Sequence, residues 1–110
     1  MLTHQSLTEH RVPRVLNLHT DPIPREAVYV GRGRGSKWGN PFRIGCDGTR
    51  EEVIAKYARW ILRQPQLMAA LHELTGKDLV CFCAPQACHA HVLLVLANPW
   101  LVLRRVHLPH

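Results

Sequence analysis

Three of the four cysteines lie within nine residues, beside a histidine, in the stretch that runs from Cys81 to His89. As a metal site, Cys81, Cys83, Cys88 and His89 would offer three sulfurs and one nitrogen, a set that zinc accepts in tetrahedral geometry. As a catalytic site, a thiol at a helix N-terminus with a histidine beside it would suit nucleophilic attack or general acid–base chemistry. The residues that we predict to be catalytic are Cys83, Cys88 and His89.

A third interpretation is structural, because free cysteine is among the most buried residue types, and it applies above all to Cys81. We favour binding or catalysis without a metal, and we assign neither a definite reaction nor a cofactor. Zinc remains the alternative cofactor, held by the four residues named above.

A second polar stretch, residues 31–42, is rich in glycine and basic residues. Between Glu26 and Asp47 there is no acidic residue, although that interval holds three arginines and a lysine. Backbone N–H groups of glycines, surrounded by basic side chains, would suit a phosphate, and a tryptophan among them could stack on a base. The other interpretation of the tryptophan is that it fills the core beneath the loop. The predicted ligand-binding residues are Arg32, Arg34, Ser36, Lys37, Trp38 and Asn40.

The elements that position these two stretches follow from periodicity and turn signals. Apolar and β-branched residues predict strands within 12–18, 27–30 and 78–83. Thr49 and Glu52 form a capping-box pattern that starts a helix, which Pro65 ends or kinks. Further helices are expected at 66–74 and 88–97, and residues 100–103 predict either a fourth strand or a strap.

Strands that alternate with helices predict a small single-domain α/β sandwich with a largely parallel sheet of three to four strands flanked by helices. The glycine-rich stretch follows the second strand, and the cysteine turn follows the third. The carboxyl ends of parallel strands meet at one edge of a sheet, where ligands bind in open α/β folds. We therefore expect the two stretches to form one site.

A chain of 110 residues forms one domain, and we expect a flexible arm at 1–10, the α/β domain at 11–99 and a C-terminal extension at 100–110. The formal net charge of +6 favours anionic partners such as nucleotides or nucleic acid. Free cysteines, no signal-peptide pattern and no apolar run of ~18 residues lead us to expect a cytoplasmic protein without a membrane partner. The oligomeric state stays open.

Three segments of the chain, at residues 33–42, 47–52 and 76–89, together resemble the motifs of DUF4326, a family of unknown function found in bacterial and phage genomes. The likeness covers about residues 28–98. It implies one compact domain in which both polar stretches belong to a motif, and it implies no activity. It also implies a carboxylate after Cys-His-Gly, where this chain has His91.

These observations lead us to expect a domain that binds a phosphorylated ligand, a nucleotide or a nucleic-acid end, between the basic glycine-rich stretch and the cysteine turn. Two alternatives remain: a zinc-binding structural module, and a basic accessory protein that binds nucleic acid through its charge.

Overall fold

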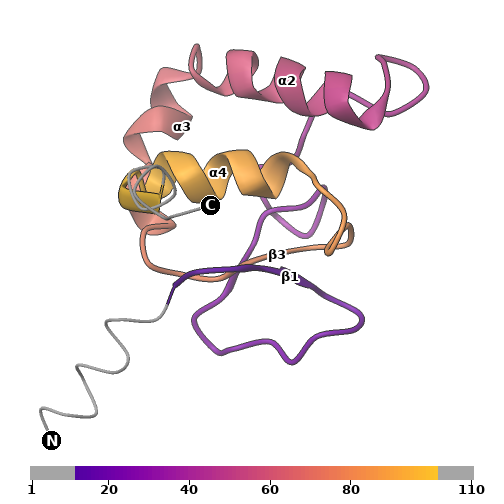
Figure 1. Cartoon of the computed structure of the whole chain (residues 1–110). Helices are drawn as coiled ribbons and strands as arrows, with labels where there is room; N and C mark the ends of the chain where they lie inside the picture. The colour runs from indigo at the N-terminus through magenta and orange to yellow at the C-terminus, as the bar shows by residue number, and fades with distance from the viewer. Residues whose placement is uncertain (1–11, 102–110) are drawn as a thin grey trace, which may run out of the picture.

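The computed structural model describes residues 12–101 of the chain, and its elements follow the predicted order (Figure 1). The strands are β1 (Val15–Asn17), β2 (Val28–Tyr29) and β3 (Leu79–Cys81). The helices are α2 (Arg50–Ile61), α3 (Pro65–Ala69), the 3-10 helix η1 (Leu71–Glu73) and α4 (His89–Ala97). The expected arm at 1–10 and most of the expected extension at 100–110 lie outside the described residues.

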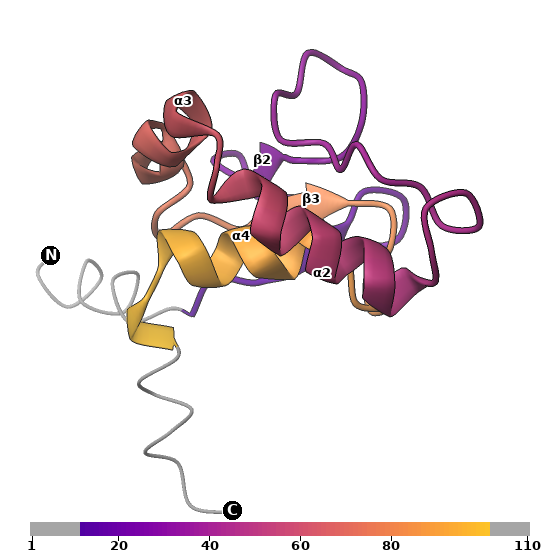
Figure 2. The same ribbon diagram turned by 90° about the horizontal axis from the view of Figure 1, so that it is seen from above.

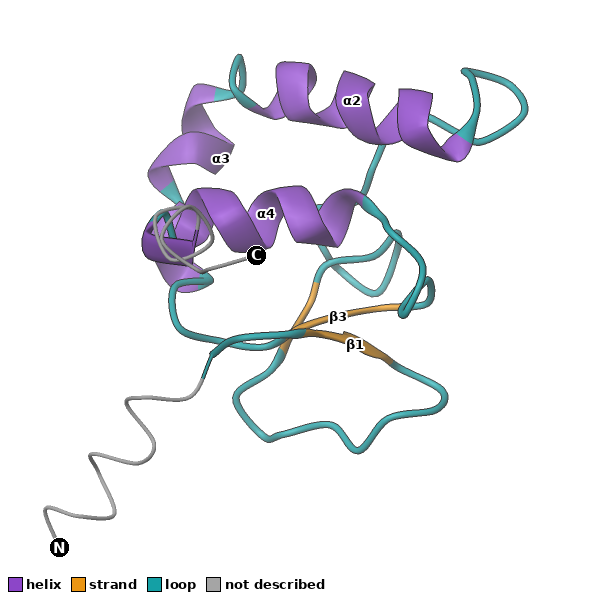
Figure 3. Ribbon diagram, in the orientation of Figure 1, coloured by secondary structure: helices purple, strands orange, loops and turns teal. Residues whose placement is uncertain are grey.

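The strands form one parallel sheet in the order β1-β3-β2, which confirms the predicted α/β class (Figure 3). Val15 of β1 and Val28 of β2 both pair with Leu79 on the central strand. All three strands therefore end at the same edge, and the glycine-rich stretch and the cysteine turn both leave from it. No fourth strand is seen in the described region: Trp100 and Leu101 are helical, and residues 102–103 lie outside it.

Two helices are stacked on one face of this sheet. The helix α4 packs against β3 and β1, and α2 packs against α4 on the side away from the strands (Figures 1 and 2). This order follows from composition, because α4 is apolar nearly all round and has Ala90, Leu93 and Ala97 fully or almost fully buried. A helix with a single apolar stripe, such as α2, suits the outer layer. Within the described residues no helix has the length and apolarity needed to cross a membrane.

The start of α2 confirms the capping-box prediction. The N–H of Glu52 donates to Thr49 Oγ1, and the N–H of Thr49 donates to Glu52 Oε1 at 2.8 Å. The hydrogen bond from the Thr49 backbone lowers the pKa of the Glu52 carboxyl. This cap sets where the helix begins and therefore where Arg50, its first residue, projects.

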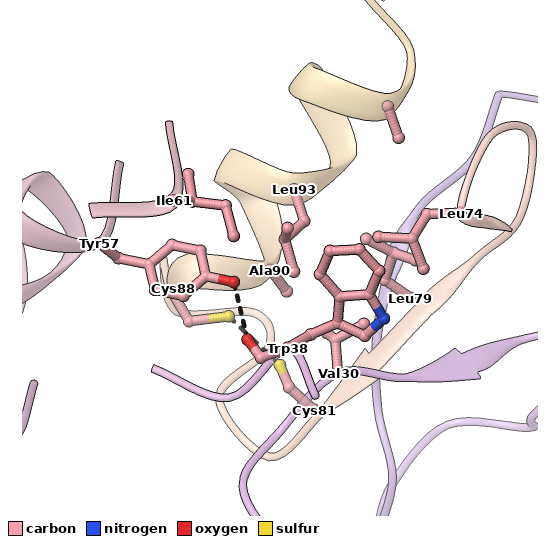
Figure 4. Packing of buried hydrophobic residues seen from close by; sticks show 11 residues of the cluster. Val30, Trp38, Tyr57, Ile61, Leu74, Leu79, Cys81, Cys88, Ala90 and Leu93 are labelled. Carbon is pink, nitrogen blue, oxygen red and sulfur yellow. Dashed lines mark hydrogen bonds between the residues drawn. The ribbon is translucent and has the colours of Figure 1, made fainter. Parts of the chain in front are cut away.

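The buried core joins the layers, and Tyr57 of α2 is part of it (Figure 4). Tyr57 Oη donates to the carbonyl oxygen of Trp38 at 2.7 Å, and its ring meets the edge of His89 at a centroid distance of 4.9 Å. Burial raises the pKa of this phenol well above its usual range. The Tyr57 side chain thus connects the loop after β2, the outer helix α2 and the start of α4.

Candidate functional site

The cysteine turn joins the end of β3 to the start of α4. Cys81 is the last residue of β3, and Cys88 is the N-cap of α4. Asn17, at the end of β1, holds the turn by donating from Nδ2 to the carbonyl oxygens of Phe82 (3.1 Å) and Ala84 (2.9 Å). The side chains of the turn are therefore positioned by a neighbouring strand as well as by their own backbone.

The turn brings three sulfurs together. The Sγ atoms of Cys81, Cys83 and Cys88 all lie within 4.8 Å of one another. Cys81 and Cys88 are almost fully buried and their sulfurs are 3.3 Å apart, so they are hydrogen-bonded (Figure 4). The N–H of Cys83 donates to Cys81 Sγ at 3.4 Å. The fourth cysteine, Cys46, is exposed and lies outside this cluster.

The hydrogen bond between the two buried thiols separates their pKa values. The hydrogen bond to Cys88 lowers the pKa of Cys81, with the N–H groups of Cys83 and Ala84 acting in the same direction. The same bond and burial raise the pKa of Cys88. The pair therefore releases one proton easily and holds the second, because two thiolates would repel each other in a buried site.

His89 is buried beside the cluster without joining it. Its Nε2 lies 2.7 Å from the carbonyl oxygen of Val30, so that nitrogen carries the hydrogen and donates it. Burial lowers the pKa of the ring, which is therefore neutral near pH 7 and leaves Nδ1 as its acceptor. The predicted set of four zinc ligands is thus not assembled. The three sulfurs converge, whereas the His89 imidazole is hydrogen-bonded to Val30, the residue that follows β2.

His91 stands where the resemblance implies a carboxylate. Its Nδ1 accepts the N–H of Cys88 at 3.2 Å, which is the hydrogen bond that an acidic side chain at this helix position would accept. His91 therefore keeps the N–H of Cys88 hydrogen-bonded at the start of α4.

A pocket of about 540 Å³ lies between the two polar stretches. Residues of both line it, as expected from parallel strands that end at one edge. The glycine-rich stretch contributes Gly31, Arg32, Asn40 and Phe42. The turn contributes Cys81, Phe82, Cys83, Ala87, Cys88 and His89. The three residues predicted to be catalytic, Cys83, Cys88 and His89, therefore share one cavity wall.

Arg32 and Asn40 shape the wall of the pocket through backbone contacts. Arg32 donates from Nε to the carbonyl oxygen of Asn40 (2.8 Å) and from Nη2 to that of Phe42 (2.7 Å). Asn40 donates from Nδ2 to Val53 and accepts the N–H of Phe42 at Oδ1. The loop closes tightly here, since a Cβ on Gly39 would lie 3.1 Å from the Cα of Arg32. A side chain at that position would require the neighbouring backbone to shift by a few tenths of an ångström, so glycine suits this close approach.

The other four residues predicted to bind ligand do not line the pocket. Trp38 is 3% exposed and lies in the core, so the core interpretation is the one the structure supports and its ring is not free to stack on a base. Ser36 Oγ accepts the N–H of Trp38. Lys37 pairs with Glu73 at 3.0 Å, and the Arg34 guanidinium lies over the rings of Tyr29 and Phe82.

Two other arginines, which the sequence did not single out as ligand-binding, line the pocket instead. Arg43 and Arg50 both line the pocket, and Arg50 donates from Nη1 to the carbonyl oxygen of Ala87 at 3.1 Å. Arg43 lies in the acid-free interval, which was the available signal. For Arg50 the capping box marks the start of the helix, but only the packing of α2 shows which way its first side chain points.

The fold and the site define a small parallel α/β domain with a pocket at the carboxyl edge of its sheet, walled by a basic loop and a cysteine turn. The chain matches the model of the family described as "Domain of unknown function (DUF4326)" over residues 16–99, so it belongs to that family. No curated protein and no solved structure shows significant similarity to it.

Proposed function

We propose that this domain binds a phosphorylated ligand, a nucleotide or a nucleic-acid end, in the pocket between the glycine-rich loop and the cysteine turn. The observation that carries the proposal is the charge of the pocket wall. Three arginines line it, Arg32, Arg43 and Arg50, and no Asp or Glu is present among its described lining residues. A concave site in which positive side chains outnumber negative ones concentrates anionic ligands.

The arginines have hydrogen-bonding capacity left for a ligand. A guanidinium carries five N–H donors, of which Arg32 uses two on carbonyl oxygens and Arg50 uses one. The described structure gives the Arg43 side chain no hydrogen bond to protein. Arginine forms strong bidentate hydrogen bonds to phosphate oxygens, and contacts to carbonyl groups keep two of these side chains in place before a ligand arrives.

An aromatic surface beside the pocket supports a nucleotide over a bare phosphate. Phe82 lines the pocket and is 42% exposed, with His19 at a centroid distance of 4.8 Å and Tyr29 at 5.8 Å. An exposed ring that its neighbours hold in place can stack on a base at little cost in side-chain entropy. A volume of about 540 Å³ is within the usual range for small-molecule sites.

The test is isothermal titration of the full chain with a nucleoside monophosphate, a nucleoside diphosphate, the parent nucleoside, inorganic phosphate and a 5′-phosphorylated oligonucleotide. The phosphorylated compounds should bind and the nucleoside should not. Arg43→Gln should weaken phosphate-dependent binding about tenfold, since a charge-assisted hydrogen bond contributes ~1.5–3 kcal/mol. The matched control is Arg63→Gln, which removes the same charge from an exposed position of the chain that does not line this pocket.

Equal effects of Arg43→Gln and Arg63→Gln would mean that net charge, not the pocket, attracts the ligand. No binding of any phosphorylated compound at millimolar concentration would contradict the proposal. Binding of long single strands alone, with a steep dependence on salt, would instead support the accessory protein that binds nucleic acid through its charge.

A further inference from the structure

We propose that the thiolates of Cys81, Cys83 and Cys88 bind one zinc ion, and that the fourth coordination position of this ion faces the pocket. The three side chains come from the end of a strand, from a turn and from a helix N-cap, yet their sulfurs all lie within 4.8 Å of one another. This inference does not depend on phosphate binding, because it rests on the sulfurs alone.

The spacing of the sulfurs suits the ion. In tetrahedral zinc sites the Zn–S bond is about 2.3 Å, which places neighbouring sulfurs about 3.8 Å apart. The sulfurs of Cys81 and Cys88 are 3.3 Å apart, and no separation in the cluster exceeds 4.8 Å. Small rotations of the side chains would equalise these distances around an ion, and the thiol hydrogens would be released to solvent.

The protein supplies three ligands in the described region and leaves the fourth open. No His, Asp or Glu joins the cysteine cluster there. His89 donates from Nε2 to Val30, and His91 uses Nδ1 to accept the N–H of Cys88. All three cysteines line the pocket, so a water molecule or a ligand oxygen can reach the remaining position. Three protein ligands with one open position are typical of catalytic zinc sites, whereas structural sites are closed by four.

The surroundings compensate the charge of such a site. Three thiolates and a divalent cation carry one net negative charge. The N-terminus of α4, which begins at the residue after Cys88, offers a positive dipole end, and the N–H of Cys83 donates to Cys81 Sγ. Arg50 is held beside the turn by its hydrogen bond to Ala87. Sulfur ligands select zinc over magnesium or calcium, which require oxygen ligands.

The experiment measures the metal content of the full chain, expressed in zinc-supplemented medium without a histidine tag and purified under reducing conditions without chelators. We expect about one zinc per chain in the wild type. Cys83→Ser should fall below about 0.1 zinc per chain, since it removes one of three ligands. Its side chain is partly exposed, so the variant should still fold, and circular dichroism checks that it does. Cys46→Ser is the matched control: Cys46 also lines the pocket but lies outside the cysteine cluster, so this variant should keep its zinc.

Titration of the reduced apoprotein with Co²⁺ gives an independent readout, because thiolate ligation produces a charge-transfer absorption that Cys83→Ser should lose. Arg43→Gln should retain full zinc content, which separates this inference from the proposed phosphate site. Less than about 0.1 zinc per chain in the wild type, even after zinc is added to the reduced protein, would overturn it. Equal zinc content in the wild type and Cys83→Ser would also overturn it, as would a Cys81–Cys88 disulfide that persists under reducing conditions.

Discussion

The cysteine turn and the glycine-rich loop leave the same edge of the sheet, but they contribute to the pocket in different ways. In the turn, Cys81, Cys83, Cys88 and His89 all line the cavity. In the loop, Arg32 lines it, whereas Trp38 is buried in the core and Lys37 pairs with Glu73. The turn therefore presents its reactive groups at the site, and the loop mainly builds the wall.

The difference lies in side-chain length and in what anchors the backbone. A cysteine sulfur is one bond beyond Cβ, so a strand followed by a tight turn and a helix N-cap places it almost completely. A lysine or arginine head group is several rotatable bonds away, and contacts with distant residues decide its position. Arg34, for example, lies over two aromatic rings that belong to β2 and to the cysteine turn. Local sequence is a better guide to short side chains than to long ones.

The strongest test of this comparison is Trp38→Ala. If the loop is built on a buried tryptophan, its removal should lower the free energy of unfolding by about 3–5 kcal/mol, as expected for a large core side chain. The measurement is urea denaturation followed by circular dichroism. Lys37→Ala is the matched control in the same loop, and its exposed ion pair should contribute at most about 1 kcal/mol. Similar losses in both variants would mean that Trp38 does not anchor the loop.

A second test is Tyr57→Phe, which breaks the contact between the two regions. The carbonyl oxygen of Trp38 would lose its partner, so stability should fall by about 1–3 kcal/mol near neutral pH. The phenol pKa is raised in the folded protein, so its contribution is complete below the unfolded value of ~10 and declines above it. The stability difference between the wild type and Tyr57→Phe should therefore shrink as pH rises past that value. Urea denaturation at pH 7 and at alkaline pH checks this, and a difference that grew with pH would contradict it.

The smallest expected effect concerns Arg34, which sequence reasoning placed in the ligand site. Arg34→Gln should leave the affinity for phosphorylated compounds within about twofold and should lower stability by about 0.5–1 kcal/mol, the usual contribution of an exposed cation–π contact. Isothermal titration beside Arg43→Gln makes the comparison. A loss for Arg34→Gln as large as that for Arg43→Gln would return Arg34 to the site and show that the loop supplies more positive charge than that of Arg32 alone.

The fold was largely predictable, because its signals are local. The capping box at Thr49 and Glu52 fixes the start of α2 by two short hydrogen bonds that depend on no other element. The apolar run of α4 marks a helix buried on most sides. A strand at residues 100 and 101 was one of two expectations and it was wrong, because Trp100 and Leu101 are helical. Their apolar side chains suit either conformation.

The sequence predicted the location of the pocket better than it predicted which residues line it. Parallel strands that end at one edge bring the two polar stretches together, and that conclusion needs only the order of elements. The identity of the basic groups needs the packing of α2, because Arg50 reaches the pocket from the first turn of that helix. Asn17 was missed for the same reason: its hydrogen bonds span 65 and 67 positions of the chain, and no local pattern predicts them.

The sequence by itself determined the order of strands and helices, the α/β class and the position of the cysteines at a strand-to-helix turn, since these depend on periodicity, caps and turns within a few residues. Tertiary structure alone decided that the three sulfurs converge while His89 is hydrogen-bonded to Val30, and that Arg43 and Arg50 join the predicted Arg32 at the pocket. These outcomes depend on contacts between residues far apart in the chain, where packing selects one among many side-chain conformations.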